Sequence, residues 1–328
     1  MKFTSLGTTG LKVSQLGFGT YVFDNNIWRH DISDEEAIEL MTYANSQGVN
    51  YFNSSLYYGS GKCEELLGKA IKEMKREDVV VCTKVGSHKD IRPLDNSPEF
   101  ILKSTENILK RMDLDYIDVF LIHGPDPKTP LKESIGVLNM LKETNIVKHI
   151  GLSNHSLEQI KEAQQYGNIE VLEFYYSLLT QNGIARGNDE LRNYCLDNNI
   201  AMTTFRSIER GILSDLFPDD ETILHMNELY ESPYQNPVNR TKLAELIKKL
   251  KHLAKSNDMT LAQLAIAWSL QEGQTDISLI GMSDKLQIDE NVKATELVLN
   301  ERLVTELNEL VSNYSFDRDG VMNTTRKV

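Results

Sequence analysis

A short apolar run, a polar turn and an amphipathic helix follow one another repeatedly along this chain of 328 residues. The apolar runs are rich in β-branched residues and are too short for buried helices, so they predict strands. Eight such runs are found, at residues 15–20, 49–53, 79–84, 117–123, 149–152, 171–174, 201–205 and 277–280. Apolar strands that alternate with helices are typical of a parallel sheet covered by helices. Eight units in this length favour a closed (β/α)₈ barrel of the TIM type over an open doubly wound sheet.

Three hydroxyl residues begin capping boxes, in which the hydroxyl and a side chain three residues later satisfy free N–H groups reciprocally. The boxes are Ser33 with Glu36, Ser156 with Gln159, and Thr260 with Gln263. Helices are therefore expected to begin at these three positions, between the predicted strands.

The segments outside the repeating units predict features of their own. Residues 3–6 and 11–14 flank Gly7-Thr-Thr-Gly10, which predicts a β-hairpin that covers the N-terminal mouth of the barrel. Residues 207–242 are expected to be irregular, and segments of that length are usually functional or disordered. No linker or low-complexity run divides the chain, so residues 1–328 are expected to form a single domain.

Composition excludes several classes of protein. Hydrophobic residues make up 40% and charged residues 25%, as in ordinary globular proteins. The net charge of -13 argues against binding to nucleic acid or to an anionic membrane surface. Neither a signal peptide nor an apolar stretch of membrane-spanning length is found. Cys63, Cys82 and Cys195 have no paired or metal-binding spacing, which indicates a reducing compartment and no metal site. We expect a soluble, cytoplasmic protein.

Polar side chains stand at the carboxyl ends of the predicted strands, where barrels of this type place their active sites. Lys84 ends an apolar run, and burying its ammonium costs several kcal/mol unless it is paired or has a chemical role. His123 ends another run, with a hydrogen-bonded core imidazole as an equal alternative. The other polar or aromatic residues at or just beyond strand ends are Asn53, Tyr58, Ser153, Asn154, Glu173 and Phe205.

Residues 48–59 resemble the signature of the aldo-keto reductase family, in which a strand-end Asp precedes a Tyr-Gly pair. Further matches lie at residues 64–70, 83–84, 115–126, 150–154 and 290–291. The resemblance spans roughly residues 3–311, and the matches taken together are highly specific. The loop at residues 95–99 and the helix after it look most like the bacterial branch associated with inositol utilisation.

The resemblance implies a catalytic tetrad of Asp, Tyr, Lys and His, here occupied by Asn53, Tyr58, Lys84 and His123. A nicotinamide cofactor, by family default NADPH, would deliver hydride to the carbonyl carbon of a small aldehyde, ketone or sugar-like substrate. Tyr58 would protonate the carbonyl oxygen, and the Lys84 cation would lower the pKa of this phenol. His123 would orient the carbonyl and help to polarise it.

The resemblance also implies a cofactor site and a substrate pocket. Ser153 and Asn154 match the residues that hold the nicotinamide carboxamide, and Phe205 matches an aromatic ring that stacks on the nicotinamide. The remaining implied cofactor contacts are Thr20, Tyr21, Glu173, Arg206, Gly281, Ser283, Gln287, Glu290 and Asn291. Trp28 stands where the family lines its substrate pocket, and packing is its alternative role.

Three positions depart from the family's pattern. Asn53 replaces the Asp that would pair with Lys84, and because an amide cannot neutralise a cation, we expect reduced turnover. Glu173 replaces a Gln, and its charge near the nicotinamide would favour the oxidised cofactor. Gln287 replaces a frequent Arg near the 2′-phosphate of NADPH, where Lys285 is one of the remaining charges. NADH is therefore an alternative cofactor.

Two other functions stay open. Asn53 and Glu173 also suggest a nicotinamide-nucleotide-binding sensor or partner subunit with little turnover. A lyase that forms a Schiff base on Lys84 follows from the residues alone, but the spacing of Tyr58 and His123 makes it the weakest hypothesis. The sequence predicts neither the physiological substrate nor the oligomeric state.

Overall fold

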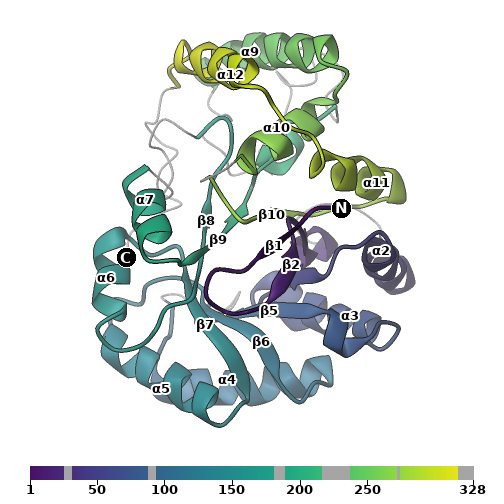
Figure 1. The fold of residues 1–328 in the computed structure, drawn as a ribbon. Coiled ribbons are helices and arrows are strands. Elements are labelled where there is room, and N and C mark those ends of the chain that lie inside the picture. Colours follow the sequence, from purple (N-terminus) through teal and green to yellow (C-terminus); the bar gives the residue numbers. More distant parts are fainter. Residues whose placement is uncertain (26–31, 88–93, 181–188, 216–236, 272–273, 317–328) are drawn as a thin grey trace.

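The computed structural model describes residues 1–25, 32–87, 94–180, 189–215, 237–271 and 274–316. Within them, eight parallel strands close into a barrel in the order β10-β3-β4-β5-β6-β7-β8-β9 (Figure 1). The strands are β3 (Leu16–Gly19), β4 (Tyr51–Asn53), β5 (Val80–Val85), β6 (Ile117–Ile122), β7 (Val147–Ser153), β8 (Val171–Tyr175), β9 (Ala201–Phe205) and β10 (Ile277–Ile280). The predicted (β/α)₈ barrel and its eight strands are confirmed, with only their ends displaced.

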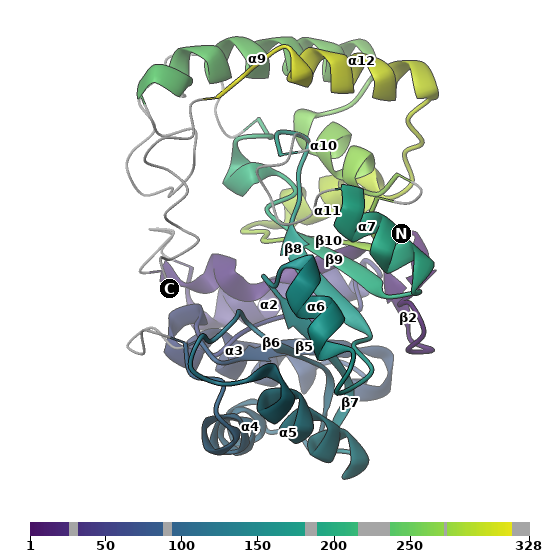
Figure 2. The same cartoon turned by 90° about the vertical axis from the view of Figure 1, so that its left-hand side faces the viewer.

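Helices surround the barrel and connect its strands. They are α2 (Asp34–Ser46), α3 (Lys62–Ile71), α4 (Pro98–Met112), α5 (Leu131–Glu143), α6 (Leu157–Ala163), α7 (Asp189–Asp197), α9 (Pro237–Ser256), α10 (Leu261–Ser269), α11 (Lys285–Ala294) and α12 (Glu301–Ser312). Short 3₁₀ turns are η1 (Thr20–Phe23), η2 (Tyr58–Gly61), η3 (Arg76–Asp78) and η4 (Glu209–Gly211). Figure 2 shows α9 and α12 side by side, as a layer beyond the barrel.

The three predicted capping boxes are present. Ser33, Ser156 and Thr260 each accept a hydrogen bond from the backbone N–H three residues later. The side chain of that later residue accepts in turn from the backbone N–H of the capping residue. These contacts begin α2, α6 and α10. The helices therefore start where the local sequence satisfies their free N–H groups.

An antiparallel hairpin of β1 (Phe3–Ser5) and β2 (Lys12–Ser14) precedes the barrel. Leu6 and Val13 of this hairpin are fully buried and pack in one apolar cluster with barrel residues such as Tyr51 and Ala201. Gly7 has φ +50°, and a Cβ there would lie 2.8 Å from the backbone nitrogen of Ala201. The hairpin therefore closes the N-terminal end of the barrel, as predicted.

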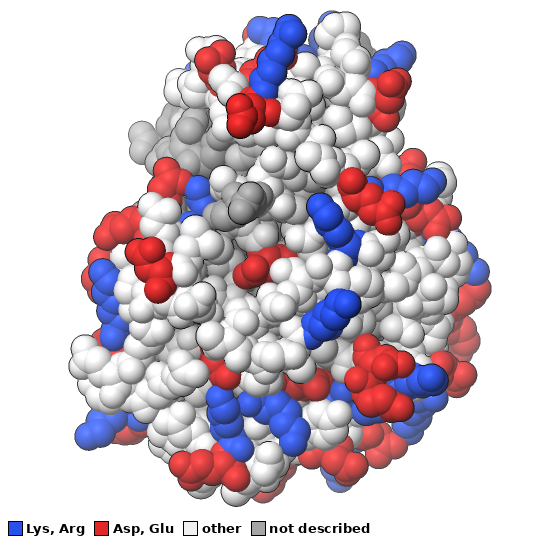
Figure 3. Space-filling model, viewed as in Figure 1, with Lys and Arg blue, Asp and Glu red and all other residues white. Residues whose placement is uncertain are grey.

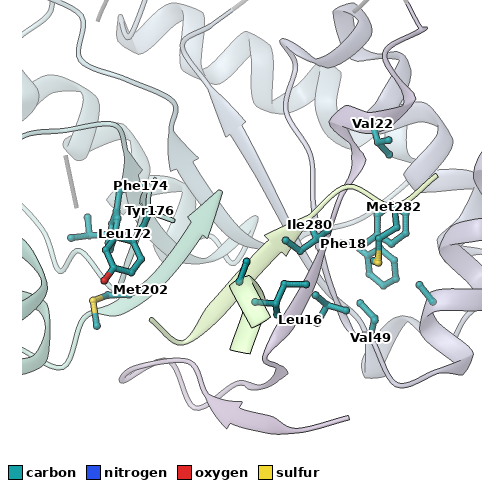
Figure 4. Close-up of a cluster of buried hydrophobic side chains, with 14 of the residues drawn as sticks. Leu16, Phe18, Val22, Val49, Leu172, Phe174, Tyr176, Met202, Ile280 and Met282 are labelled. Atoms are coloured by element: carbon teal, nitrogen blue, oxygen red, sulfur yellow. The ribbon is translucent and has the colours of Figure 1, made fainter. Parts of the chain in front are cut away.

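Side chains alternate between the two faces of each strand and so form two apolar clusters. One cluster lies between the strands and the helices and includes Leu16 and Phe18 of β3 and Leu172 and Phe174 of β8 (Figure 4). The other fills the barrel and consists of Leu6, Val13, Tyr51, Val80, Cys82, Val119, Leu121, Val171, Ala201, Ile277 and Leu279. A strand residue thus faces either the barrel interior or the surrounding helices, depending on its position along the strand.

Some predictions concern segments that the structure describes only in part. The segment 207–242, predicted to be irregular, contains η4 and ends in α9, which begins at Pro237. This part of the prediction is wrong, because the helical pattern of α9 extends back into the segment. Residues 216–236 and Trp28 lie outside the described residues.

No helix in the described part of the chain is long and apolar enough to cross a membrane. On the face of the molecule seen in Figure 3, Lys and Arg side chains lie interspersed with Asp and Glu.

Candidate active site

The alternation of side chains along the strands carries several polar residues into one end of the barrel. Tyr51 and Cys82 belong to the interior cluster, so Asn53 and Lys84, two residues farther along, also face the interior. The same parity holds for His123, Glu173 and Phe205. Except for Glu173, which is in the middle of β8, these residues stand at or within one residue of the carboxyl ends of their strands, the end that carries the active site in barrels of this type.

Lys84 is the centre of this group and is fully buried. Its Nζ donates hydrogen bonds to Asn53 Oδ1 at 2.7 Å, the Ser54 carbonyl at 3.1 Å and Tyr58 Oη at 3.2 Å. A carboxylate oxygen of Glu173, Oε1, lies 3.2 Å from the same nitrogen. Four oxygens therefore surround one ammonium group inside the barrel.

Glu173 supplies the negative charge that the residue at position 53 lacks. Asn53 lies between the two charged groups, since its Oδ1 accepts from Lys84 while its Nδ2 donates to Glu173 Oε2 at 2.6 Å. Burial is the largest single effect and lowers the pKa of Lys84, but Glu173 and, after it, Tyr58 and Cys82 together outweigh burial, and the net shift is upward. Lys84 thus has a carboxylate beside it although position 53 is an amide, because β8 carries the acid across the barrel.

Tyr58 begins η2, in the segment that follows β4, and its hydroxyl accepts the bond from Lys84. Burial raises the pKa of the Tyr58 phenol by more than Lys84 lowers it, and Glu173 adds to the rise. Lys84 thus acts in the predicted direction, but the net shift is upward. The Tyr21 ring lies 4.7 Å from the Tyr58 ring, centroid to centroid. The phenol keeps its proton at neutral pH.

His123 follows β6 and meets Tyr58 edge-on, with ring centroids 6.1 Å apart. Its Nδ1 lies 3.0 Å from Ser55 Oγ, and its ring is also edge-on to Tyr57 at 6.2 Å. The imidazole is half-buried. It is therefore held from one side and stands beside the Tyr58 ring.

The end of β7 and the middle of β8 offer groups that suit a carboxamide. Asn154 has φ 62° and donates from Nδ2 to the His123 carbonyl at 3.1 Å and to Ser153 Oγ at 3.0 Å. Ser153 Oγ donates in turn to Glu173 Oε1 at 3.4 Å. Hydroxyl, amide and carboxylate together provide both donors and acceptors, which a primary amide ligand requires. The donor set fits the nicotinamide carboxamide.

The end of β9 brings an aromatic surface and positive charge together. The Phe205 ring stacks on Tyr175, with centroids 5.9 Å apart and planes 17° from parallel. The Arg206 guanidinium lies 5.1 Å from the centre of the Tyr175 ring. Arg206 and Arg210 have left-handed backbone angles, with φ 61° and 54°. An aromatic face beside the Arg206 guanidinium suits a planar ring linked to phosphates.

A second group of the predicted cofactor contacts lies beyond β10. Gln287 of α11 turns back, and its Oε1 accepts from the Ser283 backbone N–H at 2.9 Å. Lys285 forms an ion pair with Glu39 of α2. A Cβ on Gly281 would lie 2.9 Å from Val22 Cβ, so only glycine fits this closely packed position.

The other predicted cofactor contacts have structural partners in the same regions. Thr20 Oγ1 donates to Ser54 Oγ at 2.9 Å, which joins η1 to the segment that holds Lys84. The Glu290 carbonyl accepts from Gln263 Nε2 at 3.2 Å, and Asn291 is buried on α11. The structure thus gathers the tetrad positions around Lys84, and gathers the residues beyond β10 on α11.

Three residues near the site were missed by the sequence reasoning. Ser54 and Ser55 hold Lys84 and His123, and their place directly after the strand-end Asn53 was the available signal. Glu209 is buried and accepts from Ser177 Oγ at 2.6 Å and from the Tyr175 hydroxyl. It lies in the segment predicted to be irregular, where no pattern indicated a buried acid.

Metal ligands do not gather in the described residues: no three His, Cys, Asp or Glu side chains there are placed to hold a metal ion. Cys63, Cys82 and Cys195 are all buried free thiols.

Comparison with known proteins matches residues 15–312 to the family described as "Aldo/keto reductase family". A probable aldo-keto reductase 1 of Glycine max is 30% identical over 93% of this chain and 88% of the relative. A probable voltage-gated potassium channel subunit beta of Arabidopsis thaliana is 32% identical over 91% of this chain and 92% of the relative. An NADH-specific methylglyoxal reductase of Escherichia coli is 28% identical, with 94% and 98% covered.

Among solved structures, the holo form of an aldo-keto reductase from Bacillus halodurans superposes with a TM-score of 0.78. Its sequence is 25% identical, and the match covers 97% of this chain and 99% of that one. The narrower resemblance to the inositol-utilisation branch stays a prediction.

Proposed function

The chain belongs to the aldo/keto reductase family, and from this we propose that it reduces an aldehyde, ketone or sugar-like carbonyl with hydride from a nicotinamide nucleotide. The observation that carries this proposal is the hydrogen bond of 3.2 Å between Tyr58 Oη and the buried Lys84 ammonium. It gives a protonated phenol a charged neighbour in a water-poor site, as a general acid requires.

Tyr58 donates its proton to the carbonyl oxygen in the proposed reaction. A nicotinamide nucleotide held by these residues would supply a hydride to the carbonyl carbon, which with the Tyr58 proton would convert the carbonyl to an alcohol and leave the nucleotide oxidised. Lys84 stabilises the phenolate that Tyr58 becomes, since the ammonium already donates to its oxygen. His123, edge-on to Tyr58, orients the carbonyl oxygen between the two rings.

Ser153 and Asn154 are proposed to hold the carboxamide, with Phe205 against the nicotinamide ring. NADPH is the proposed hydride donor and NADH the alternative. Two contacts support the alternative: Gln287 is turned toward Ser283, and Lys285 is paired with Glu39. Gln287 and Lys285 both lie in the segment where the family usually places basic residues for the 2′-phosphate of NADPH. Both side chains are bound to other groups of the protein. The E. coli relative is named as NADH-specific.

A second candidate function is a nucleotide-binding partner subunit with little turnover. The similarity to a probable potassium channel subunit beta supports it. The Schiff-base lyase is the least supported candidate, because an amine nucleophile needs a lowered pKa. Lys84 is fully buried among oxygens and its pKa is raised.

A reducing, cytoplasmic location is proposed from the thiols, since Cys63, Cys82 and Cys195 are all free.

The test is a titration of the purified chain with NADPH and NADH, followed by nucleotide fluorescence, and then a screen of small aldehydes, ketones and sugars. We expect nucleotide binding and steady oxidation of the nucleotide with at least one carbonyl. Tyr58→Phe is expected to lower kcat by about 10²–10⁴-fold with little change in nucleotide affinity.

Each other outcome is informative. Nucleotide binding without turnover across the panel would favour the partner-subunit candidate. An unchanged kcat in Tyr58→Phe would remove Tyr58 from the mechanism, and failure to bind either nucleotide would exclude both candidates.

A further inference from the structure

Glu173 lies in the middle of β8 and Asn53 ends β4, and each departs from the residue that the family resemblance implies. The resemblance implies an acid at position 53 and an amide at position 173, whereas this chain has the amide first and the acid second. The two side chains are joined by a hydrogen bond of 2.6 Å from Asn53 Nδ2 to Glu173 Oε2. The two departures are therefore one exchange of acid and amide across a single hydrogen bond.

We propose that Glu173 is the positioning residue that holds the Lys84 ammonium at the Tyr58 hydroxyl. We propose also that Glu173 can do so only with a neutral amide, that of Asn53, as its hydrogen-bond partner. The inference rests on the proposed function, because it assigns the support of the proposed proton donor. It goes beyond that function by naming two residues, Asn53 and Glu173. Replacing either one alone by the residue usual in the family should impair the site, and replacing both together should preserve it.

The contacts of Glu173 balance charge inside the barrel. Glu173 Oε1 lies 3.2 Å from Lys84 Nζ and accepts from Ser153 Oγ at 3.4 Å, and its other oxygen accepts from Asn53. The side chains of Lys84 and Glu173 are 0% and 2% exposed. In such an interior an unpaired charge is strongly unfavourable, so each of the two depends on the other.

The amide of Asn53 serves both of its neighbours at once. Its oxygen accepts from the Lys84 ammonium, and its NH₂ group donates to the Glu173 carboxylate. An ionised acid at this position only accepts, so it would place two carboxylate oxygens at the distance of a hydrogen bond. Such a pair must bind an additional proton or separate.

The exchange removes the reason to expect low turnover from Asn53 alone. Lys84 has one carboxylate beside it in this chain, as the family arrangement also provides, although the charge comes from β8 instead of β4. Asn53→Asp by itself would then add an unwanted negative charge and would not restore activity.

The experiment is a double-mutant cycle of four chains: unaltered, Asn53→Asp, Glu173→Gln and the double variant. It is measured by kcat and KM and, separately, by thermal unfolding of the nucleotide-free protein. We expect each single change to lower kcat by about tenfold or more and to lower the Tm. The double variant is expected to recover most of the lost kcat and most of the lost Tm. In it the acid at position 53 again accepts from Lys84, and the new amide at position 173 donates to that acid.

The pH profile provides a readout that a purely structural role would not move. Asn53→Asp should regain activity relative to the unaltered chain as the pH falls from about 8 to about 6, since one proton shared by the two acids restores a single negative charge. The titratable groups around this pair are Lys84, Tyr58, Cys82 and Tyr51. Burial raises the pKa of the Cys82 thiol to about 12, and the pKa values of the other three are raised as well, so none of them titrates there. His123, beside Tyr58, is common to all four chains.

Glu170→Gln is the matched control. Glu170 directly precedes the first residue of β8, at the end of the strand away from the site, and it pairs with His149 and Lys142. Combined with Asn53→Asp, it should give additive losses of Tm. If losses in the Asn53/Glu173 cycle are also additive, the inference is wrong. If Glu173→Gln fails to fold, a folded double variant supports the inference and an unfolded one overturns it.

The two proposals fail in different ways. If no chain oxidises a nucleotide but the thermal cycle shows rescue, the proposed function fails and the charge exchange stands. If the unaltered chain is an active reductase and neither cycle shows rescue, the exchange fails and the function stands.

Discussion

The Tyr58 hydroxyl lies at the boundary between the buried Lys84–Glu173 pair and the half-buried His123. Burial and the Glu173 charge raise the pKa of this phenol, and Lys84 opposes them only in part. A raised pKa means that the group keeps its proton to higher pH. For a donor in carbonyl reduction this is the required form, while the reverse reaction needs the deprotonated oxygen.

Reduction and oxidation should therefore depend on pH in opposite ways. The kcat/KM for carbonyl reduction should stay high until the pH exceeds the ordinary tyrosine value of about 10. Oxidation of the matching alcohol should be slow at neutral pH and should rise over the same alkaline range. Both are measured as kcat/KM against pH with one substrate–product pair.

Tyr58→Phe is the control for this prediction, since it should abolish the alkaline step in both directions. A fall in reduction centred well below pH 10 would contradict the assignment of the step to Tyr58.

Single residues at strand ends were predictable, but their partners were not. Lys84 and His123 were recognisable because a charged or polar residue ends an apolar run. The contact between Lys84 and Glu173 depends on the closure of the barrel, which brings β5 and β8 together although neither pairs with the other. No local pattern encodes that contact, so the sequence did not predict that Glu173 pairs with Lys84.

At the scale of elements, a buried ion pair fastens α3 and α4 to the outside of β5. Glu64 of α3 is fully buried, accepts from Thr83 Oγ1 of β5 at 2.6 Å, and accepts from Arg111 Nη2 of α4 at 2.7 Å. Burial raises the pKa of Glu64 by more than Arg111 lowers it. The carboxylate therefore depends on its arginine to remain charged.

Arg111→Leu should destabilise the fold by about 3–5 kcal/mol, because it leaves a buried carboxylate without its cation. Urea unfolding near pH 7 measures the loss. The pKa of Glu64 in the folded variant would rise further above its unfolded value, so stability falls as pH rises through that range. The loss should thus be smaller near pH 5.

Lys69→Ala is the control on the same helix, since Lys69 pairs with Glu65 at the surface. It should change stability by at most about 1 kcal/mol. A loss in Arg111→Leu no greater than this would contradict the role given to the pair.

The existence of the elements was well predicted, and their ends were less so. The strand runs were visible because buried parallel strands are apolar on both faces, and the capping boxes marked helix starts such as Ser33. The start of α9 at Pro237 was missed, because two prolines and polar residues precede its regular pattern.

For the whole molecule, the barrel separates two ends with different tasks. The carboxyl ends of the strands carry Lys84 and its neighbours, and the opposite end is closed by the hairpin through Leu6 and Val13. Changes at the closed end should therefore alter stability and leave the proposed chemistry intact.

Leu6→Ala should cost about 2–5 kcal/mol of unfolding free energy, because it removes fully buried methyl groups from the base of the barrel. Urea unfolding measures this, and kcat of the folded variant should not change. Phe3→Ala, at a side chain that is 42% exposed, should stay within about 0.5 kcal/mol. A large fall in kcat for Leu6→Ala would show that the two ends are coupled.

The hydrogen bond from Asn53 to Glu173 joins positions that lie 120 residues apart in the chain. A chimera that crosses over between them, with one half from this protein and the other from a relative of the usual type, would inherit either two amides or two acids around Lys84. We therefore expect such recombination to preserve the site only when both positions come from one parent. The Asn53–Glu173 pair thus limits the crossover points at which this barrel can be recombined with a relative.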